Sequence, residues 1–153
     1  MTLNQYQELA KGTDCRDEKI KMICNGFGLI GELEEYKECS LEDKKNIIKE
    51  SGDVMWYCSS ICSCLGADLQ EVCNKEIKEI DRPIAEVFKK AFRDNKGVFD
   101  KKYKEDILTY VNYVINWILP FGTKNLEEIM QANIDKLYSR KQRGVIKGDG
   151  DNR

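Results

Sequence analysis

Two pairs of acidic residues, each spaced three positions apart, most constrain the fold of this chain. They are Glu32 with Glu35 and Glu50 with Asp53. Residues three apart in a helix lie on one face, about one turn from each other. The two pairs are symmetric about residues 42–43. An antiparallel helical hairpin that turns there would place Glu35 opposite Glu50. The same hairpin would place Glu32 opposite Asp53, so the sequence predicts four carboxylates at one level of two facing helices.

Apolar residues surround both pairs. Glu32 follows the run FGLIG (residues 27–31), and Asp53 precedes VMWY (residues 54–57). Acidic pairs are common on solvated helix faces, and surface pairs are the plainer interpretation in a chain with 27 acids. Carboxylates set in apolar surface are costly to bury, however, and four together repel unless a cation lies between them. All-oxygen ligands suit a hard ion, so the pattern favours Mg²⁺, then Mn²⁺, with Ca²⁺ as a further candidate.

The composition narrows the class of protein. The chain of 153 residues is long enough to bury a core, and we expect residues 1–153 to form one domain. A net charge of −2 argues against a binder of nucleic acid polymers. No apolar run reaches the roughly 18 residues of a membrane span, and the first residues lack the features of a signal peptide. We therefore expect a cytoplasmic protein with no membrane partner.

The chain has seven cysteines and no histidine. Without histidine, Ser-His, Cys-His and His–metal chemistry are excluded, so any catalysis must rest on other side chains or a metal. An odd number of cysteines and no Cys-x-x-Cys pair argue against structural zinc. We expect small, reduced thiols buried in the core.

Helical periodicity covers most of the chain, and no strand pattern is present. In a long helix expected over residues 17–39, apolar residues recur at steps of three and four: Ile20, Ile23, Phe27, Ile30, Leu33 and Tyr36. The other predicted helices span residues 3–11, 40–65, 68–81, 84–94, 100–119 and 126–142. Capping signals (Ser40 with Asp43, Asp68 with Glu71, Asn125 with Glu128) mark three of the starts, and breaks are expected at Gly66, at 82–83, at 95–97 and at 120–122. The predicted fold class is all-α, an antiparallel helical bundle.

Glycines and basic residues add two more signals. Gly26, Gly28 and Gly31 lie inside the 17–39 helix, where each costs roughly 1 kcal/mol against alanine, so a partner helix or a ligand is expected to approach closely. Asn133, Lys136 and Arg140 share one stripe of the last helix. The stripe could hold phosphate oxygens, although cations at a helix end also complement its dipole. The glycine-rich tail, residues 144–153, is either a disordered end or a loop that folds over a nucleotide or a neighbouring subunit.

These motifs together resemble a known family. The stretches GLIGELEEY (residues 28–36) and KESGDVMWY (residues 49–57) are similar to the MazG-like all-α nucleoside triphosphate pyrophosphohydrolases. The family signature is Glu-x-x-Glu, a spacer, then Glu-x-x-Asp, and here the spacer has 14 residues. The segment NIDKLYSR (residues 133–140) also resembles the family's C-terminal Asn-x-x-Lys-Leu-x-x-Arg. The resemblance covers roughly residues 3–80 and 124–143.

The resemblance implies an enzyme, a fold and a set of site residues. It implies an all-α NTP pyrophosphatase bundle that cleaves the α–β phosphate bond of (d)NTPs, giving a monophosphate and pyrophosphate, in nucleotide-pool house-cleaning. Mg²⁺ would be held by Glu32, Glu35, Glu50 and Asp53, and Mn²⁺ is the second choice. Glu35 or Glu50 would accept the proton of the attacking water. Asn133, Lys136, Arg140 and Tyr57 would bind the substrate, with Lys136 and Arg140 on the outer phosphates, although core packing is the plainer role for Tyr57 and for its neighbours Trp56 and Phe27.

Two departures from the family pattern affect what is expected. Residues 83–122 form a helical insertion that could extend the bundle, cover the site or contact another subunit. Glu34 stands where many relatives have glycine, and we expect its side chain to point away from the site. Family resemblance also implies a homodimer or homotetramer. The competing hypotheses are a non-catalytic nucleotide- or metal-binding regulatory or assembly module, and a structural helical oligomer with an acidic surface.

Overall fold

Helices form all the regular structure of the described chain. The computed structural model describes residues 1–122 and 125–146, except for the side chains of 120–122. Within these ranges no strand is present, so the predicted all-α class is confirmed. The elements are α1 (Leu3–Lys11), α2 (Glu18–Glu38), α3 (Lys44–Cys64), α4 (Leu69–Cys73), α5 (Ile84–Arg93), the 3₁₀ turn η1 (Lys101–Tyr103), α6 (Lys104–Gly122) and α7 (Leu126–Gln142).

The predicted hairpin is present, and α2 and α3 pack closely against each other. The start of α3 differs from the prediction, because the helix begins at Lys44 and not at Ser40. Asp43 is itself the N-cap, and its Oδ1 accepts from the Asn46 backbone N–H at 3.1 Å. Aspartate caps a helix as well as serine does, and the four residues before Asp43 are needed to reverse the chain.

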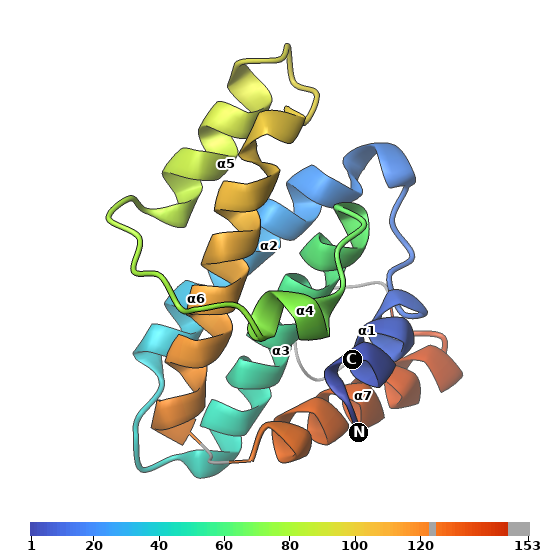
Figure 1. Ribbon diagram of the computed structural model, residues 1–153. Helices are drawn as coiled ribbons and strands as arrows, with labels where there is room; N and C mark the ends of the chain where they lie inside the picture. Colours follow the sequence, from blue (N-terminus) through green and yellow to red (C-terminus); the bar gives the residue numbers. More distant parts are fainter. Residues whose placement is uncertain (123–124, 147–153) are drawn as a thin grey trace.

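α3 lies at the centre of the molecule. It contacts α1, α2, α6 and α7, and Figure 1 shows α6 running alongside it while α7 lies across its lower part, beside α1. The core residues that α6 contributes include Ile107, Val111, Ile115 and Ile118. The Tyr36 hydroxyl of α2 donates to the Ile118 carbonyl at 2.9 Å. The 83–122 insertion therefore extends the bundle within the chain.

Other helix boundaries also differ from the prediction, and the helix expected from residue 100 begins at Lys104, after the 3₁₀ turn η1. The helix expected over 68–81 ends at Cys73, because the carbonyls of Lys75 and Glu76 accept from Asn112 Nδ2 on α6 (3.1 and 3.4 Å). The Asn112 side chain thus donates to backbone carbonyls that would otherwise accept hydrogen bonds within a longer helix. The predicted break at 120–122 is also wrong, since α6 continues to Gly122. A proline removes one backbone donor but need not end a helix at its own position.

The break at Gly66 is confirmed. This glycine has a φ of +63°, and the Ala67 N–H donates to the Cys62 carbonyl at 2.9 Å. The Gly66 N–H donates to the Ser63 carbonyl at 3.2 Å. The two bonds form a Schellman motif, in which the left-handed residue is usually glycine.

The buried face of α2 is not the one that its apolar spacing predicts. Leu33 and Tyr36 are buried, but Ile20 is 47% exposed and Phe27 is 70% exposed. α2 instead presents polar or small residues such as Asn25 to its neighbours, together with Leu29. Apolar residues occur around more than one face of this helix, so periodicity alone selects the wrong set at its N-terminal half.

Gly28 and Gly31, one turn apart on α2, have opposite surroundings. A Cβ added at Gly28 would lie 2.0 Å from Cε1 of the Tyr57 ring, so the ring packs directly on the α2 backbone. A Cβ added at Gly31 would meet no atom within 4 Å. The close approach that the glycines predict is therefore found at Gly28 and is absent at Gly31 among the described residues.

This contrast predicts opposite effects of two alanine substitutions on the free energy of unfolding. Gly31→Ala should stabilise by up to about 1 kcal/mol, because alanine is the better helix former and has room. Gly28→Ala should destabilise by roughly 1–3 kcal/mol, because the methyl group displaces the Tyr57 ring. Denaturant unfolding of both variants beside the parent measures this. Equal effects of the two changes would contradict the packing of Tyr57 on Gly28.

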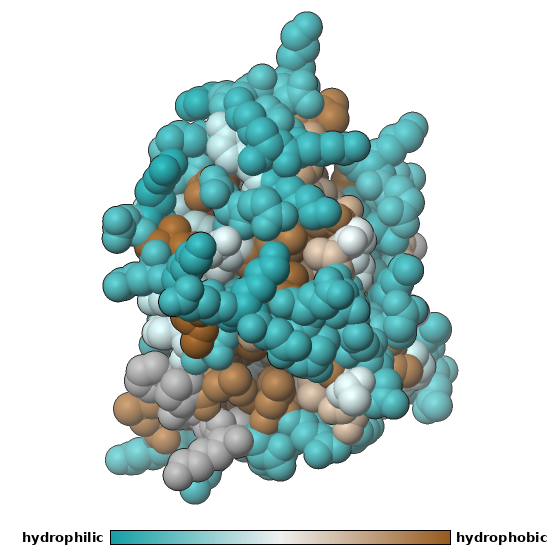
Figure 2. Space-filling model, in the orientation of Figure 1, coloured by the Kyte–Doolittle hydropathy of each residue, from teal (hydrophilic) through white to brown (hydrophobic). Residues whose placement is uncertain are grey.

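One face of the molecule is mostly hydrophilic. In the view of Figure 2, hydrophilic side chains cover most of this face, and hydrophobic ones show in small patches between them. Across the part of the chain that the structure describes, no helix combines the length and the apolar character needed to cross a membrane.

Candidate metal and phosphate site

Three of the four predicted carboxylates meet across the α2–α3 hairpin. One oxygen from each of Glu32, Glu35 and Glu50 lies within 4.8 Å of the other two. Glu50 is buried, Glu32 is partly buried and Glu35 is exposed, so the group opens toward solvent on the α2 side. Glu34 points away as expected, and its carboxylate pairs with Lys37 at 2.7 Å in solvent. The hairpin thus brings three of the four predicted acids together, and Asp53 is not part of this group.

Glu50 is the buried end of this group, with 4% of its surface exposed. Its Oε1 accepts from the ammonium group of Lys49 at 2.6 Å. Its Oε2 is buried and has no hydrogen-bond partner among the described residues. A buried carboxylate oxygen without a partner is costly, and each such atom in a native protein needs an explanation.

Asp53, the fourth predicted acid, lies at the α3–α7 contact. Its Oδ1 accepts from Asn133 Nδ2 at 3.2 Å and from the ammonium group of Lys136. The Tyr6 hydroxyl of α1 donates to Asn133 Oδ1 at 2.9 Å. The Tyr6 hydroxyl therefore orients the Asn133 amide, which in turn donates to Asp53. Residues of α1 and α7 thus fix the position of this carboxylate on α3.

α7 approaches α3 closely at this point because residue 52 has no side chain. A Cβ at Gly52 would lie 2.9 Å from Cβ of Asn133. Of the predicted stripe, Asn133 and Lys136 thus meet the acidic residues directly. Arg140 lies one turn further along α7 and is buried.

The crowding of carboxylates changes the ionisation of Glu32. Burial and then the negative charge of Asp53, with smaller contributions from Glu35 and Glu50, raise the pKa of Glu32 from 4.5 to about 8. Asp53 is the strongest charged neighbour of Glu32, which agrees with the predicted facing of these two residues. A cation placed among the acids would oppose this shift, since a nearby positive charge favours the ionised carboxylate.

Aromatic side chains lie beside the acids on α3. Trp56 and Tyr57 are in edge-to-face contact with their ring centroids 4.9 Å apart. The Arg16 guanidinium lies 4.9 Å from the centroid of Trp56 and 5.7 Å from that of Tyr57. Burial, and next the charge of Glu32, raise the pKa of Tyr57, so this ring lies close to the carboxylates. Tyr57 is half-buried, in line with both the packing role and the substrate role considered from the sequence.

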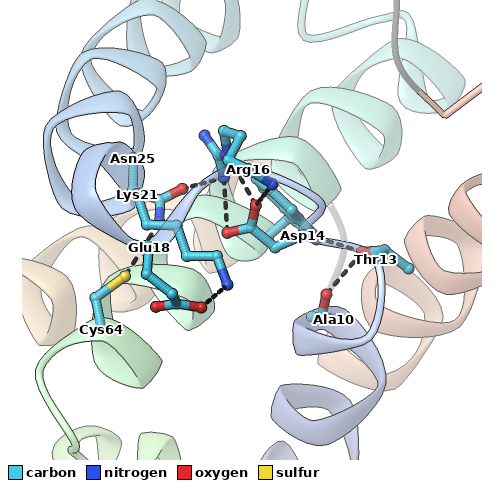
Figure 3. A network of polar contacts seen from close by, with 9 residues as sticks. Ala10, Thr13, Asp14, Arg16, Glu18, Lys21, Asn25 and Cys64 are labelled. Atoms are coloured by element: carbon cyan, nitrogen blue, oxygen red, sulfur yellow. Dashed lines mark hydrogen bonds and ion pairs between the residues drawn. The ribbon is translucent and has the colours of Figure 1, made fainter.

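The segment between α1 and α2 holds Arg16 in this position. Asp14 accepts from Arg16 Nε at 2.9 Å and from Nη2 at 3.0 Å, and Nη2 also donates to Asn25 Oδ1 of α2 (Figure 3). The neighbouring Thr13 hydroxyl accepts from Trp56 Nε1 at 2.9 Å. The α1–α2 connection is therefore fixed to both helices of the hairpin, next to the aromatic pair.

The seven cysteines are all free thiols, but they are not all buried. Cys58 and Cys62 lie in the core, where burial raises the pKa of both thiols. Cys15 and Cys64 are exposed, which the expectation of buried thiols did not include.

Three residues of this region were not predicted from the sequence to be part of the site. Tyr6 and Arg16 are far from the acids in sequence, and nothing local indicates their contacts. Lys49 directly precedes Glu50, and that adjacency was a usable signal. A lysine next to a buried acid can supply its counter-charge.

Comparisons with known proteins add one similarity. No family model matches the chain, and no solved structure matches it. The chain is similar to the Gene 37 protein of Mycobacterium phage L5, with 37% identity over 73 residues. The match covers 46% of this chain and 64% of the phage protein, which is less than two thirds of that protein's length. Family membership therefore rests on the motifs and stays a prediction.

The raised pKa of Glu32 predicts how stability depends on pH in protein freed of metal with EDTA. The folded state holds the Glu32 proton more tightly than the unfolded chain does, so this contribution is complete below pH 4.5 and is lost as pH rises to about 8. Glu32→Gln removes the loss. The difference in melting temperature, variant minus parent, should be positive and should grow over this range. Glu34→Gln, at a solvated position, is the control, and a difference that does not change with pH would contradict the shift.

Proposed function

We propose that this protein is a Mg²⁺-dependent nucleoside triphosphate pyrophosphohydrolase of the MazG-like type. It would cleave (d)NTPs to the monophosphate and pyrophosphate, in nucleotide-pool house-cleaning. The observation that carries the proposal is the meeting of Glu32, Glu35 and Glu50 within 4.8 Å across two helices. Lysine and amide groups from α7 stand next to them, and phosphate chemistry needs both kinds of group.

The residues fit a hard divalent cation. The donors are carboxylate oxygens without nitrogen or sulfur, which is the set that Mg²⁺ and Mn²⁺ prefer. Oε2 of Glu50, which has no partner among residues 1–122 and 125–146, supplies a buried negative atom that a cation would satisfy. Glu32, Glu35 and Glu50 would hold the ion, and Asp53 would join them by leaving Lys136. A cation there would polarise the α-phosphorus and lower the pKa of the attacking water.

Side chains of this chain would carry the remaining steps. Glu35 is the better placed of the two candidate bases, because it is exposed to water while Glu50 is buried against Lys49. Its carboxylate would accept the proton of the water that attacks the α-phosphorus. The bond from the α-phosphorus to the bridging oxygen breaks, and pyrophosphate leaves with the electron pair. Lys136 would neutralise the outer phosphates, and Arg140 would act on them only after leaving its buried position.

The nucleoside end would lie toward Tyr57. Its ring is close to Glu32, and together with Trp56 and Arg16 it offers π faces of the kind on which bases stack. Along α3, Lys49 comes before the acids Glu50 and Asp53, and the aromatic pair comes after them. A nucleotide would therefore bind with its phosphates toward the N-terminal half of that helix.

The exposed face of α2 supports a homodimer or homotetramer. Ile20 and Phe27 are large apolar side chains that the described residues cover only in part, and a Cβ at Gly31 on the same helix would meet no described atom within 4 Å. Covering such a face is favourable by about 25 cal/mol per Å² of apolar area removed from water.

The first experiment measures monophosphate and pyrophosphate formation from a panel of standard and modified NTPs and dNTPs. The parent should turn over at least one of them only with Mg²⁺ or Mn²⁺. Glu50→Gln should lower kcat by about 10²-fold or more, because it removes a ligand charge that holds the cation, and the cation stabilises the charge that develops in the transition state. Glu34→Gln is the matched control and should leave the rate unchanged. Normal metal binding with no turnover of any nucleotide would reject the enzyme and favour the non-catalytic binding module.

A second experiment measures the molar mass in solution by light scattering after size exclusion. The parent should exceed the 17.7 kDa of one chain. Phe27→Glu should lower the mass to that of one chain, because a charge on the apolar face cannot be buried without a partner. Leu41→Glu, at an equally exposed apolar position outside α2, should not. A monomeric parent would exclude the oligomer.

A further inference from the structure

Beside the acids, α3 and α7 enclose a pocket of about 190 Å³. Its lining residues are Lys45, Ile48, Lys49, Ala132, Asn133 and Lys136. Most of the surface that lines the pocket is apolar, but three of the six residues carry ammonium groups and one carries an amide. An anion that enters it would therefore meet positive charge. Whole-ligand pockets are typically about 300–1,000 Å³, so the volume fits part of a ligand, such as a phosphate group, better than a whole nucleotide.

Two of the three lysines are already paired with acids of the site. Lys49 binds Glu50 at 2.6 Å, and Lys136 binds Asp53. Lys45 differs, because it has no carboxylate partner among residues 1–122 and 125–146. The pocket therefore holds two ammonium groups that compensate the acids and one that does not.

We propose that Lys49 and Lys136 exchange partners when a cation binds. Each ammonium group leaves its carboxylate, on Glu50 or Asp53, and binds substrate phosphate instead. Lys45 completes this phosphate subsite. The inference rests on the proposed pyrophosphohydrolase function and assigns the place of the outer phosphates within it. Neither the four-acid signature nor the Asn133–Arg140 stripe assigns a role to Lys45 or Lys49.

Charge balance gives the physical reason for the exchange. Glu50 and Asp53 need counter-charges, and the two lysines provide them in the structure. Once a divalent cation neutralises the same carboxylates, each ammonium group loses its attraction and stands next to a like charge. Lysine is a point charge on a flexible stem, so it can turn to a neighbouring anion without any change of the backbone.

Measurements of cation and phosphate binding can distinguish this exchange from an ion pair that only supports the fold. Because Lys49 and Lys136 compete with the cation for carboxylates, removing either lysine should tighten cation binding. Because both also bind phosphate, the same change should weaken phosphate binding. Lys45 does not compete, so its removal should affect phosphate alone. A lysine that only supports the fold would weaken both.

The experiment compares Lys49→Gln, Lys136→Gln and Lys45→Gln, with Lys44→Gln as the control on the same helix. Mn²⁺ alone is titrated into protein freed of metal, and free Mn²⁺ is measured by electron paramagnetic resonance. Pyrophosphate is then titrated by calorimetry at saturating Mg²⁺. We expect Lys49→Gln and Lys136→Gln to lower the Mn²⁺ Kd roughly three-fold, as for partly exposed ion pairs. We expect the pyrophosphate Kd to rise about ten-fold in these two variants and in Lys45→Gln, as for charged hydrogen bonds. Lys44→Gln should change neither, and Lys49→Arg, which keeps the charge, should keep pyrophosphate binding.

The outcomes separate this inference from the proposed function. Weaker Mn²⁺ binding in Lys49→Gln or Lys136→Gln, in a protein that binds Mn²⁺ and hydrolyses a nucleotide, overturns the exchange alone. Tighter Mn²⁺ binding with unchanged pyrophosphate binding also overturns it. A parent protein that binds no Mn²⁺ overturns the proposed function, and the exchange with it. Melting temperatures of all variants establish that each is folded.

Discussion

The burial of Glu50 at the centre of a helical hairpin sets the conditions for the rest of the structure. A carboxylate with 4% exposure must be compensated, and here one oxygen binds Lys49 while the other has no described partner. Glu32 and Glu35 approach from the facing helix, and their carboxyl groups bring no positive charge that could compensate it. Packing of α2 on α3 alone would therefore be opposed by electrostatics, and the surrounding helices must supply the compensation.

That compensation explains why α1 and α7 are placed where they are. α7 brings Lys136 and Asn133 to Asp53, and α1 brings Tyr6 to Asn133. The absence of a side chain at Gly52 allows this approach. A residue pair separated by more than 120 positions, Tyr6 and Asn133, is thus part of the support of one carboxylate. α6 has a different task, since it covers the apolar side of α3 and leaves the acidic side to α2 and α7.

Local signals in the sequence predicted what local physics determines. The end of α3 at Gly66 follows from backbone geometry, and the start of α7 at Asn125 follows from a side-chain cap. Both were predicted. The meeting of the acids across the hairpin followed from their spacing, because the two pairs are symmetric about the turn between the helices. The end of α4 was not predicted, since it depends on Asn112 from a distant helix. The exposed side of α2 was not predicted either. Phe27 and Leu33 are equally apolar, and only the positions of α3 and α5 decide which is covered.

The difference between local and distant contacts also explains which residues of the site were predicted from the sequence and which were not. The acids were found because two of them lie within one turn of each other in each helix. Lys49 and Tyr6 were missed because a counter-charge or an orienting hydroxyl can come from anywhere in the fold, and sequence spacing does not restrict it. Compensation of buried charge is a requirement that can be stated from sequence, but its source is known only once the helices are placed.

The site also works against the stability of the fold that carries it. Glu32 has a pKa of about 8 because folding buries it and places it among other acids, and Glu50 keeps an oxygen in the interior that has no partner among the described residues. Replacing either acid by an uncharged residue would relieve the folded protein, so these residues are not explained by stability. Arrangements that oppose stability while orienting several side chains toward one point are typical of functional sites. The acids, the lysines that compensate them and the aromatic pair beside them are therefore the residues of the site that we propose, where a bound cation would relieve the unfavourable charge.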